Sequence, residues 1–181
     1  MIKHIRRDEG FTLVELMIVV AIIGVLAALA IYGVSRYLKH AKTAEATRNL
    51  GSMETGSKNQ FQQETDTSGI GTGPFVHTFC PNSAINPPST GLPAAAKIKA
   101  PPADWGDPAW QCLKFSINEP QFYRYTYVGN TTTTGTAATY TATANGDLDG
   151  NGVQSTFQLI GAGSQTGDAQ RTALLITNED E

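Results

Sequence analysis

Residues 10–35 read GFTLVELMIVVAIIGVLAALAIYGVS, and this stretch decides the fold. No charged residue occurs in the 20 positions from Leu16 to Ser35. A helix that rises about 1.5 Å per residue would cross the roughly 30 Å hydrocarbon core of a bilayer over this length. Lys3, Arg6 and Arg7 precede the run, and cations hold that end of a span in the cytoplasm. The sequence therefore predicts a membrane-spanning helix whose C-terminal side faces outward.

Glu15 lies at the head of the apolar run and separates the competing interpretations. A plain single-span anchor does not explain it, because charged groups inside a membrane are costly and usually mark a function. A secretory signal peptide is the second alternative, since Ala28-Leu29-Ala30 has the small residues of a cleavage site. An acid at the head of the hydrophobic region does not suit that alternative. A third interpretation has to account for Glu15 itself.

The residues Gly10-Phe11-Thr12-Leu13-Val14-Glu15 resemble the type III signal of type IV prepilins and pseudopilins. The resemblance is strongest over residues 10–31. It implies that a prepilin peptidase cuts after Gly10, removes the leader 1–10 and methylates the new amine of Phe11. It also implies that Glu15 neutralises the Phe11 amine of a neighbouring subunit. The physical reason is that an unpaired carboxylate in apolar surroundings is costly, and a cationic partner offsets much of the cost.

One position departs from the family pattern. Many type IV pilins have a proline where this chain has Tyr32, and that proline helps to unwind the helix inside the filament. Here the first proline is Pro74. Gly24 and Gly33 weaken the helix by about 1 kcal/mol each relative to alanine. Local melting of the helix and a pseudopilin identity both stay open at this point.

The helix is expected to continue beyond the apolar run. Ala46, Leu50, Met53, Ser57 and Phe61 recur at helical spacing, and no proline interrupts them. We predict one helix over about residues 12–63, with a hydrophobic half at 11–35, an amphipathic half at 36–63 and a head domain at 64–181. The net charge is −3 and the sequence has no basic stripe, so we do not expect it to bind nucleic acid.

The head domain is expected to combine a long loop with a sheet. Gly69, Gly71, Gly73 and Pro74 end the helix, and residues 64–108 read as an irregular, proline-rich connection. Candidate strands then follow at Gln111–Ile117, Gln121–Val128, Ala138–Ala144, Val153–Ile160 and Thr172–Ile176. Short loops between them favour an antiparallel sheet of about four strands. The predicted fold class is α+β and pilin-like.

Two cysteines and two tryptophans lie in or beside the predicted connection. Cys80 and Cys112 allow one pairing, and outside the cytoplasm we expect a disulfide worth roughly 3–4 kcal/mol. Two buried free thiols are the alternative. Trp105 and Trp110 are expected to pack under the connection, with an exposed adhesive aromatic as the other interpretation.

The residues DLDGNG at 147–152 match the start of a calcium loop. Asp147, Asp149 and Asn151 have side-chain oxygens, and Val153 a backbone carbonyl, for a calcium ion. The twelfth position is Gln158 rather than the glutamate of an EF-hand. An Asx-rich turn between strands is the alternative. Calcium is the one cofactor that the sequence suggests, and none is required.

No catalytic constellation is visible, so an enzyme is not expected. The favoured function is a structural subunit of a type IV pilus for adhesion or twitching motility, stored in the bacterial inner membrane before it reaches the cell surface. Its expected partners are copies of itself, the prepilin peptidase and the inner-membrane assembly machinery. The alternatives are a pseudopilin of type II secretion and a membrane-anchored binding module that never polymerises. An exposed loop is expected at Thr131–Thr134.

Overall fold

The computed structural model describes residues 10–66, 75–130, 137–164 and 167–179. The chain divides into two compact units, residues 1–38 and 39–181, which we describe separately. Three predicted features lie outside the described residues. They are the leader except for Gly10, the glycines at 69–73 with Pro74, and the loop at Thr131–Thr134.

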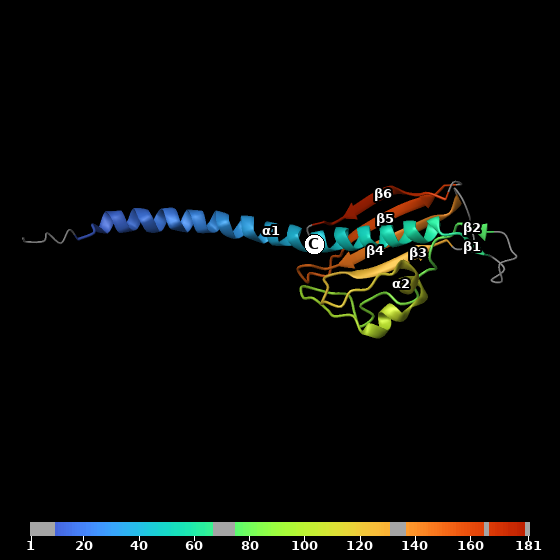
Figure 1. The fold of residues 1–181 in the computed structure, drawn as a ribbon. Helices are drawn as coiled ribbons and strands as arrows, with labels where there is room; N and C mark the ends of the chain where they lie inside the picture. The colour runs from blue at the N-terminus through green and yellow to red at the C-terminus, as the bar shows by residue number, and fades with distance from the viewer. Residues whose placement is uncertain (1–9, 67–74, 131–136, 165–166, 180–181) are drawn as a thin grey trace, which may run out of the picture. The chain divides into compact units, whose positions relative to one another are not determined.

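Helix α1 spans Leu13–Gln62, and its first part, with residues 10–12 before it, forms the described portion of the first unit (Figure 1). The predicted helix over residues 12–63 is therefore confirmed. Neither Gly24 nor Gly33 interrupts it, and no Cβ placed at either position would meet another atom. All described side chains from Phe11 to Leu38 are exposed.

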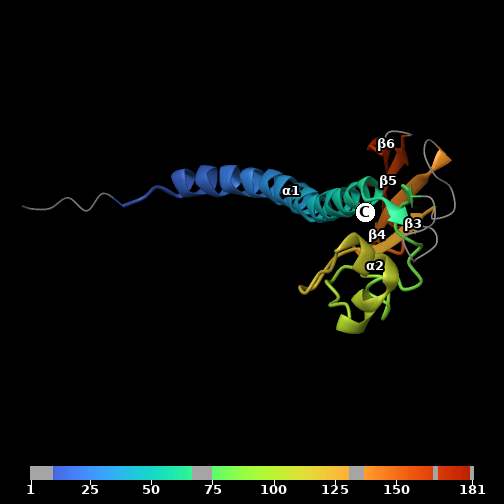
Figure 2. The same ribbon diagram turned by 45° about the vertical axis from the view of Figure 1, so that its right-hand side comes forward.

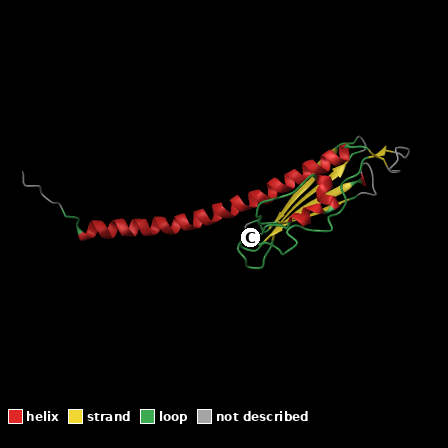
Figure 3. Cartoon of the chain, turned by 60° about the horizontal axis from the view of Figure 1, so that its bottom comes forward, coloured by secondary structure: helices red, strands yellow, loops and turns green. Residues whose placement is uncertain are grey.

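The second part of α1 buries the predicted apolar stripe. Ala46, Leu50, Met53, Ser57 and Phe61 are fully buried. Figure 3 shows this part of the helix lying along the sheet of the head. The helical spacing of these residues places them on one face, and that face packs on the sheet.

The sheet contains four antiparallel strands in the order β3-β4-β5-β6. Their bounds are β3 Arg124–Gly129, β4 Thr139–Gly146, β5 Ser155–Gly163 and β6 Ala169–Thr177. The register places Tyr125 opposite Ala144, and Ala144 opposite Phe157. These three residues are fully buried, so the row forms part of the core. The predicted four-strand meander is confirmed.

The tyrosine row of β3 faces the helix. Tyr125 and Tyr127 are fully buried, as is Tyr123 just before the strand. Asn49 Nδ2 donates to the Tyr125 hydroxyl at 2.7 Å, and the Ser57 hydroxyl lies 2.9 Å from the Tyr127 hydroxyl. The row therefore belongs to the core of the head.

The strand predicted at Gln111–Ile117 is wrong, because helix α2 spans Pro108–Leu113. The Asp107 side chain accepts a hydrogen bond from Ala109 N at 2.9 Å and so caps this helix. Pro108 occupies the first turn, where its missing N–H costs nothing. Lys114 then ends the helix in a left-handed conformation.

The connection before α2 is more ordered than the sequence predicts. Strands β1 Thr65–Asp66 and β2 Phe75–Val76 pair antiparallel, and a 3-10 helix, η1, spans Pro102–Gly106. Two buried carboxylates hold the connection by accepting backbone hydrogen bonds. Asp104 accepts from Ser89 N at 2.8 Å, and Asp107 from Ala84 N at 2.9 Å.

Two further predictions for the connection are confirmed. Trp105 and Trp110 are buried, with their rings 5.7 Å apart in an edge-on arrangement. Cys80 and Cys112 form a disulfide. The bridge joins the connection to α2. The backbone at Cys80 also lies close to Gly129 at the end of β3, because a Cβ added to Gly129 would collide with the Cys80 carbonyl.

Candidate functional site

The helix begins with a reciprocal pair of hydrogen bonds between Thr12 and Glu15. The Thr12 backbone N–H donates to Glu15 Oε2 at 3.0 Å, and the Thr12 hydroxyl lies 2.7 Å from the same oxygen. In return, Glu15 N donates to Thr12 Oγ1 at 3.3 Å. This is a capping box, in which the residue before the helix and a glutamate three positions later satisfy backbone donors for each other.

The capping box changes what Glu15 does in a single subunit. The sequence presents its carboxylate as an unpaired acid, whereas the structure gives it two donors from Thr12. One carboxylate oxygen, Oε1, has no hydrogen bond among the interactions of the described residues. Thr12 was not among the predicted site residues, although the T-x-x-E spacing is the known sequence signature of this motif.

The residues around the expected cleavage point are exposed. Gly10 precedes the helix, and a Cβ there would meet nothing within 4 Å. The Phe11 side chain is 87% exposed, which exceeds every other large apolar side chain of the described chain. Backbone at an exposed end without secondary structure is open to a protease. The geometry is thus compatible with cleavage between Gly10 and Phe11, which stays a prediction.

The apolar half of α1 has no partner within the described chain. The helix is long and apolar enough to cross a membrane, and none of its most apolar window is buried. Soluble proteins rarely expose a continuous apolar surface of this extent. This surface therefore needs lipid or other protein chains around it.

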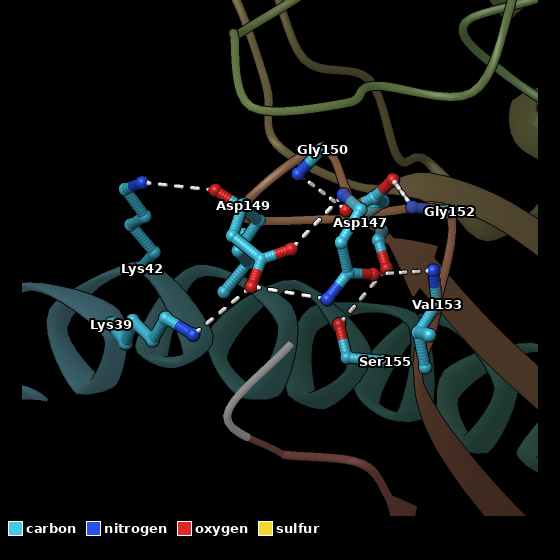
Figure 4. A network of polar contacts seen from close by, with 11 residues as sticks. Lys39, Lys42, Asp147, Asp149, Gly150, Gly152, Val153 and Ser155 are labelled. Carbon is cyan, nitrogen blue, oxygen red and sulfur yellow. Dashed lines mark hydrogen bonds and ion pairs between the residues drawn. The ribbon is translucent and has the colours of Figure 1, made fainter.

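The loop 147–153 forms a hydrogen-bonded turn (Figure 4). Asp147 accepts from Gly150 N at 2.6 Å and from Gly152 N at 3.0 Å, and Asn151 N donates to Asp149 at 3.1 Å. Gly150 and Gly152 have φ values of 79° and 90°, which side-chain-bearing residues rarely adopt. The arrangement matches the Asx-rich turn that the sequence offered as the alternative.

Two lysines of α1 fasten this loop to the helix (Figure 4). Lys39 Nζ lies 3.3 Å from Asp149 Oδ2, and Lys42 Nζ donates to the Leu148 carbonyl at 3.4 Å. The described residues include no group of three or more His, Cys, Asp or Glu side chains that would hold a metal ion. Calcium binding by Asp147, Asp149, Asn151 and Val153 stays a prediction.

Comparison with known proteins places the N-terminal segment in a family. Residues 5–31 match the prokaryotic N-terminal methylation motif. The chain is 48% identical over 58 residues to the type IV major pilin protein PilA of Myxococcus xanthus, which covers 32% of this chain and 26% of that protein. It is 33% identical over 90 residues to the fimbrial protein EcpC of Eikenella corrodens, covering 47% and 57% of the two chains.

A third relative is the type IV major fimbrial protein FimA of Dichelobacter nodosus, 49% identical over 48 residues, or 26% of this chain and 31% of that protein. The matches thus span between about a quarter and just over half of each relative. No solved structure matches the chain. The chain thus has the prokaryotic N-terminal methylation motif at residues 5–31, and over part of its length it is similar to type IV pilins and fimbrial proteins.

Proposed function

We propose that the chain is a structural subunit of a type IV pilus. The observation that carries this proposal is the apolar half of α1, whose side chains are exposed throughout the described residues from Phe11 to Leu38. In a membrane, lipid would cover this surface before assembly. In a filament, the same surface would pack against the helices of neighbouring copies. The relatives named above are pilins and fimbrial proteins, which favours a pilus over a secretion pseudopilus.

The proposal assigns a role to each part of the chain. Residues 1–10 are a leader that the prepilin peptidase removes, and Phe11 becomes the methylated N-terminus. Residues 11–35 span the inner membrane and later form the filament core. Residues 36–63 connect this segment to the head at 64–181, which forms the outer surface. The role is structural, and the chain itself performs no catalysis.

Glu15 supplies the assembly signal in this proposal. Two Thr12 donors hold Glu15 Oε2, so its orientation is set before a neighbouring subunit arrives. The methylated Phe11 amine of a neighbour keeps its positive charge and forms an ion pair with this carboxylate. In apolar surroundings such a pair is favoured over two separated charges, because each charge alone is costly there. The pair thereby fixes the register in which subunits are added.

The substitution Glu15→Ala tests this function. Assembly into filaments that shear from the cell surface should fall to background, while the membrane-bound precursor persists. Glu64→Ala is the matched control, because Glu64 is exposed and lies outside the apolar helix. Equal filament yields from Glu15→Ala, Glu64→Ala and the wild-type protein would contradict the proposal and favour a simple membrane anchor.

A further inference from the structure

The sheet of the head has two edge strands, β3 and β6, and among the residues that the structure describes a neighbouring segment covers β3 alone. Along β3, Tyr125 N donates to the Pro87 carbonyl at 2.9 Å, and Ser83 N donates to the Tyr127 carbonyl at 2.8 Å. Gly129 N donates to Asn82 Oδ1 at 2.9 Å. The segment 82–87 therefore occupies the outer edge of β3, and further strand pairing is blocked there.

The other edge strand, β6, has no such cover. Among the described residues, no backbone hydrogen bond joins β6 to a segment other than β5. Leu174, Leu175 and Ile176 are exposed by 38%, 51% and 42% respectively. An uncovered edge with apolar side chains is a template for contact with another chain. Glu179, which is exposed, lies just beyond the end of this strand.

A groove lies on the opposite flank of α1. It has a volume of about 540 Å³ and runs between Asn49 and Ser52 of the helix and the segment 114–121. Arg48 and Lys114 line it, both are exposed, and neither forms a salt bridge with another described residue.

The groove carries an excess of positive charge. Besides Arg48 and Lys114, Lys97, Glu45 and Glu119 also line it. Lys97 and Glu45 are paired at 3.4 Å. Once this pair is set aside, the charged residues that line the groove are Arg48, Lys114 and Glu119. Two positive charges and one negative charge give the groove a net charge of +1. An acidic group is thus the occupant that the groove favours electrostatically.

The groove and the edge of β6 cannot meet within one subunit. Ser52 lines the groove, whereas Glu54 is bonded to Arg171 of β6. Two positions along an α-helix differ by about 200° around its axis. Figures 1 and 2 accordingly show β6 and α2 on opposite sides of α1. A contact between these two surfaces on separate copies is heterologous, and such contacts propagate into rings or helical filaments.

We propose that the free end of β6 and Glu179 of one copy dock into the groove of the next copy in the filament. Glu179 forms ion pairs with Arg48 and Lys114. The exposed apolar side chains of β6, Leu174–Ile176, are buried from water in the same contact. This inference rests on the proposed function, because it assigns the contact between the head domains of neighbouring subunits in the same filament.

Charge reversal tests the contact. Lys114→Glu should lower the yield of sheared filaments at least about tenfold, because a like charge then faces Glu179. Adding Glu179→Lys to the same chain should restore the yield, since every copy then carries both reversed partners. Lys99→Glu is the matched control, because Lys99 is exposed and lies outside the groove, and it should leave the yield unchanged. Failure of the double variant to recover would overturn the contact.

Oxidative cross-linking gives a second readout that does not depend on filament yield. Filaments with both Asn118→Cys and Glu179→Cys should give a ladder of dimers, trimers and longer species, because each copy links to the next. Each single variant should stay monomeric. Intact filaments without a ladder, or with dimers alone, would overturn this contact and leave the pilus function standing. If the wild-type chain forms no filaments at all, the proposed function itself fails, and the contact fails with it.

Discussion

Glu54 shows how a single charged residue ties α1 to the sheet. Its carboxylate accepts hydrogen bonds from Arg171 of β6 and pairs with Lys58 at 2.8 Å. Burial raises the pKa of Glu54, but the hydrogen bonds from Arg171 and Lys58, with their positive charges, outweigh it, so the pKa lies below the ordinary value of 4.5. A lowered carboxyl pKa means that folding favours the ionised form.

We expect Glu54→Gln to lower the free energy of unfolding by about 1–2 kcal/mol at pH 7. The lowered pKa stabilises the fold above pH 4.5, and this stabilisation is lost as the pH falls through the folded-state pKa. The difference between the variant and the wild type should therefore shrink at acid pH. Thermal unfolding of detergent-solubilised protein at pH 7 and pH 3 measures it. A difference that grows on acidification would refute this account.

Whether the loop 147–153 binds calcium depends on a few of its residues. Its oxygens accept hydrogen bonds from backbone amides and from Lys39, so the turn is satisfied without a metal ion. If the predicted calcium site exists, a chelator should lower the melting temperature of the solubilised protein, and added calcium should restore it. Asp147→Asn should abolish that response. A melting curve that does not change when the chelator is added would rule out the calcium site.

At the scale of elements, two glycines of α1 form a matched pair. A Cβ on Gly51 would meet nothing within 4 Å, whereas a Cβ on Gly56 would collide with the Leu113 carbonyl at the end of α2. Gly51→Ala should raise the free energy of unfolding by about 0.5–1 kcal/mol, because alanine is the better helix former. Gly56→Ala should lower it, because α1 and α2 must separate. Urea unfolding of both variants checks the prediction, which fails if the two changes have the same sign.

The disulfide joins two elements, the connection and α2. Replacing Cys80 and Cys112 together by serine removes a cross-link across a sequence separation of 32 residues. The chain-entropy estimate for such a loop is about 3–4 kcal/mol. Denaturant unfolding of the double variant should show a loss of that order. A loss well under 1 kcal/mol would mean that Asp104, Asp107 and the buried tryptophans hold the connection without the bridge.

Helices and strands with strong periodicity were predictable from the sequence, and capped short elements were not. The stripe from Ala46 to Phe61 and the alternation in β3 each arise from one-sided burial, which a sequence records directly. Helix α2 was misread because its apolar run is too short to reveal a period. Its start signals, Asp107 followed by Pro108, were present in the sequence and indicate a helix N-terminus.

The candidate site was predictable in part for a similar reason. Glu15 stands out because a charge interrupts an apolar run, whereas Thr12 is common in many contexts and gains meaning only through its spacing to Glu15. The cover on β3 and the open edge of β6 depend on contacts between segments far apart in the sequence. No local pattern records such contacts, so a structure was needed to find them.

The two units of the whole molecule differ in how they expose helix α1. The first unit exposes the apolar part of α1, and the second buries one face of the rest of the helix in the core of the head. A chain with this division is incomplete as a monomer in water, and either lipid or sister chains have to surround its first unit.

The mass and sequence of the N-terminus in sheared surface filaments test this account most directly. The filament subunit should begin at Phe11 and carry one extra methyl group on its amine, with the whole apolar segment retained. A secreted, soluble monomer that begins at Ile31 would contradict it, because the segment proposed to form the filament core would then be absent.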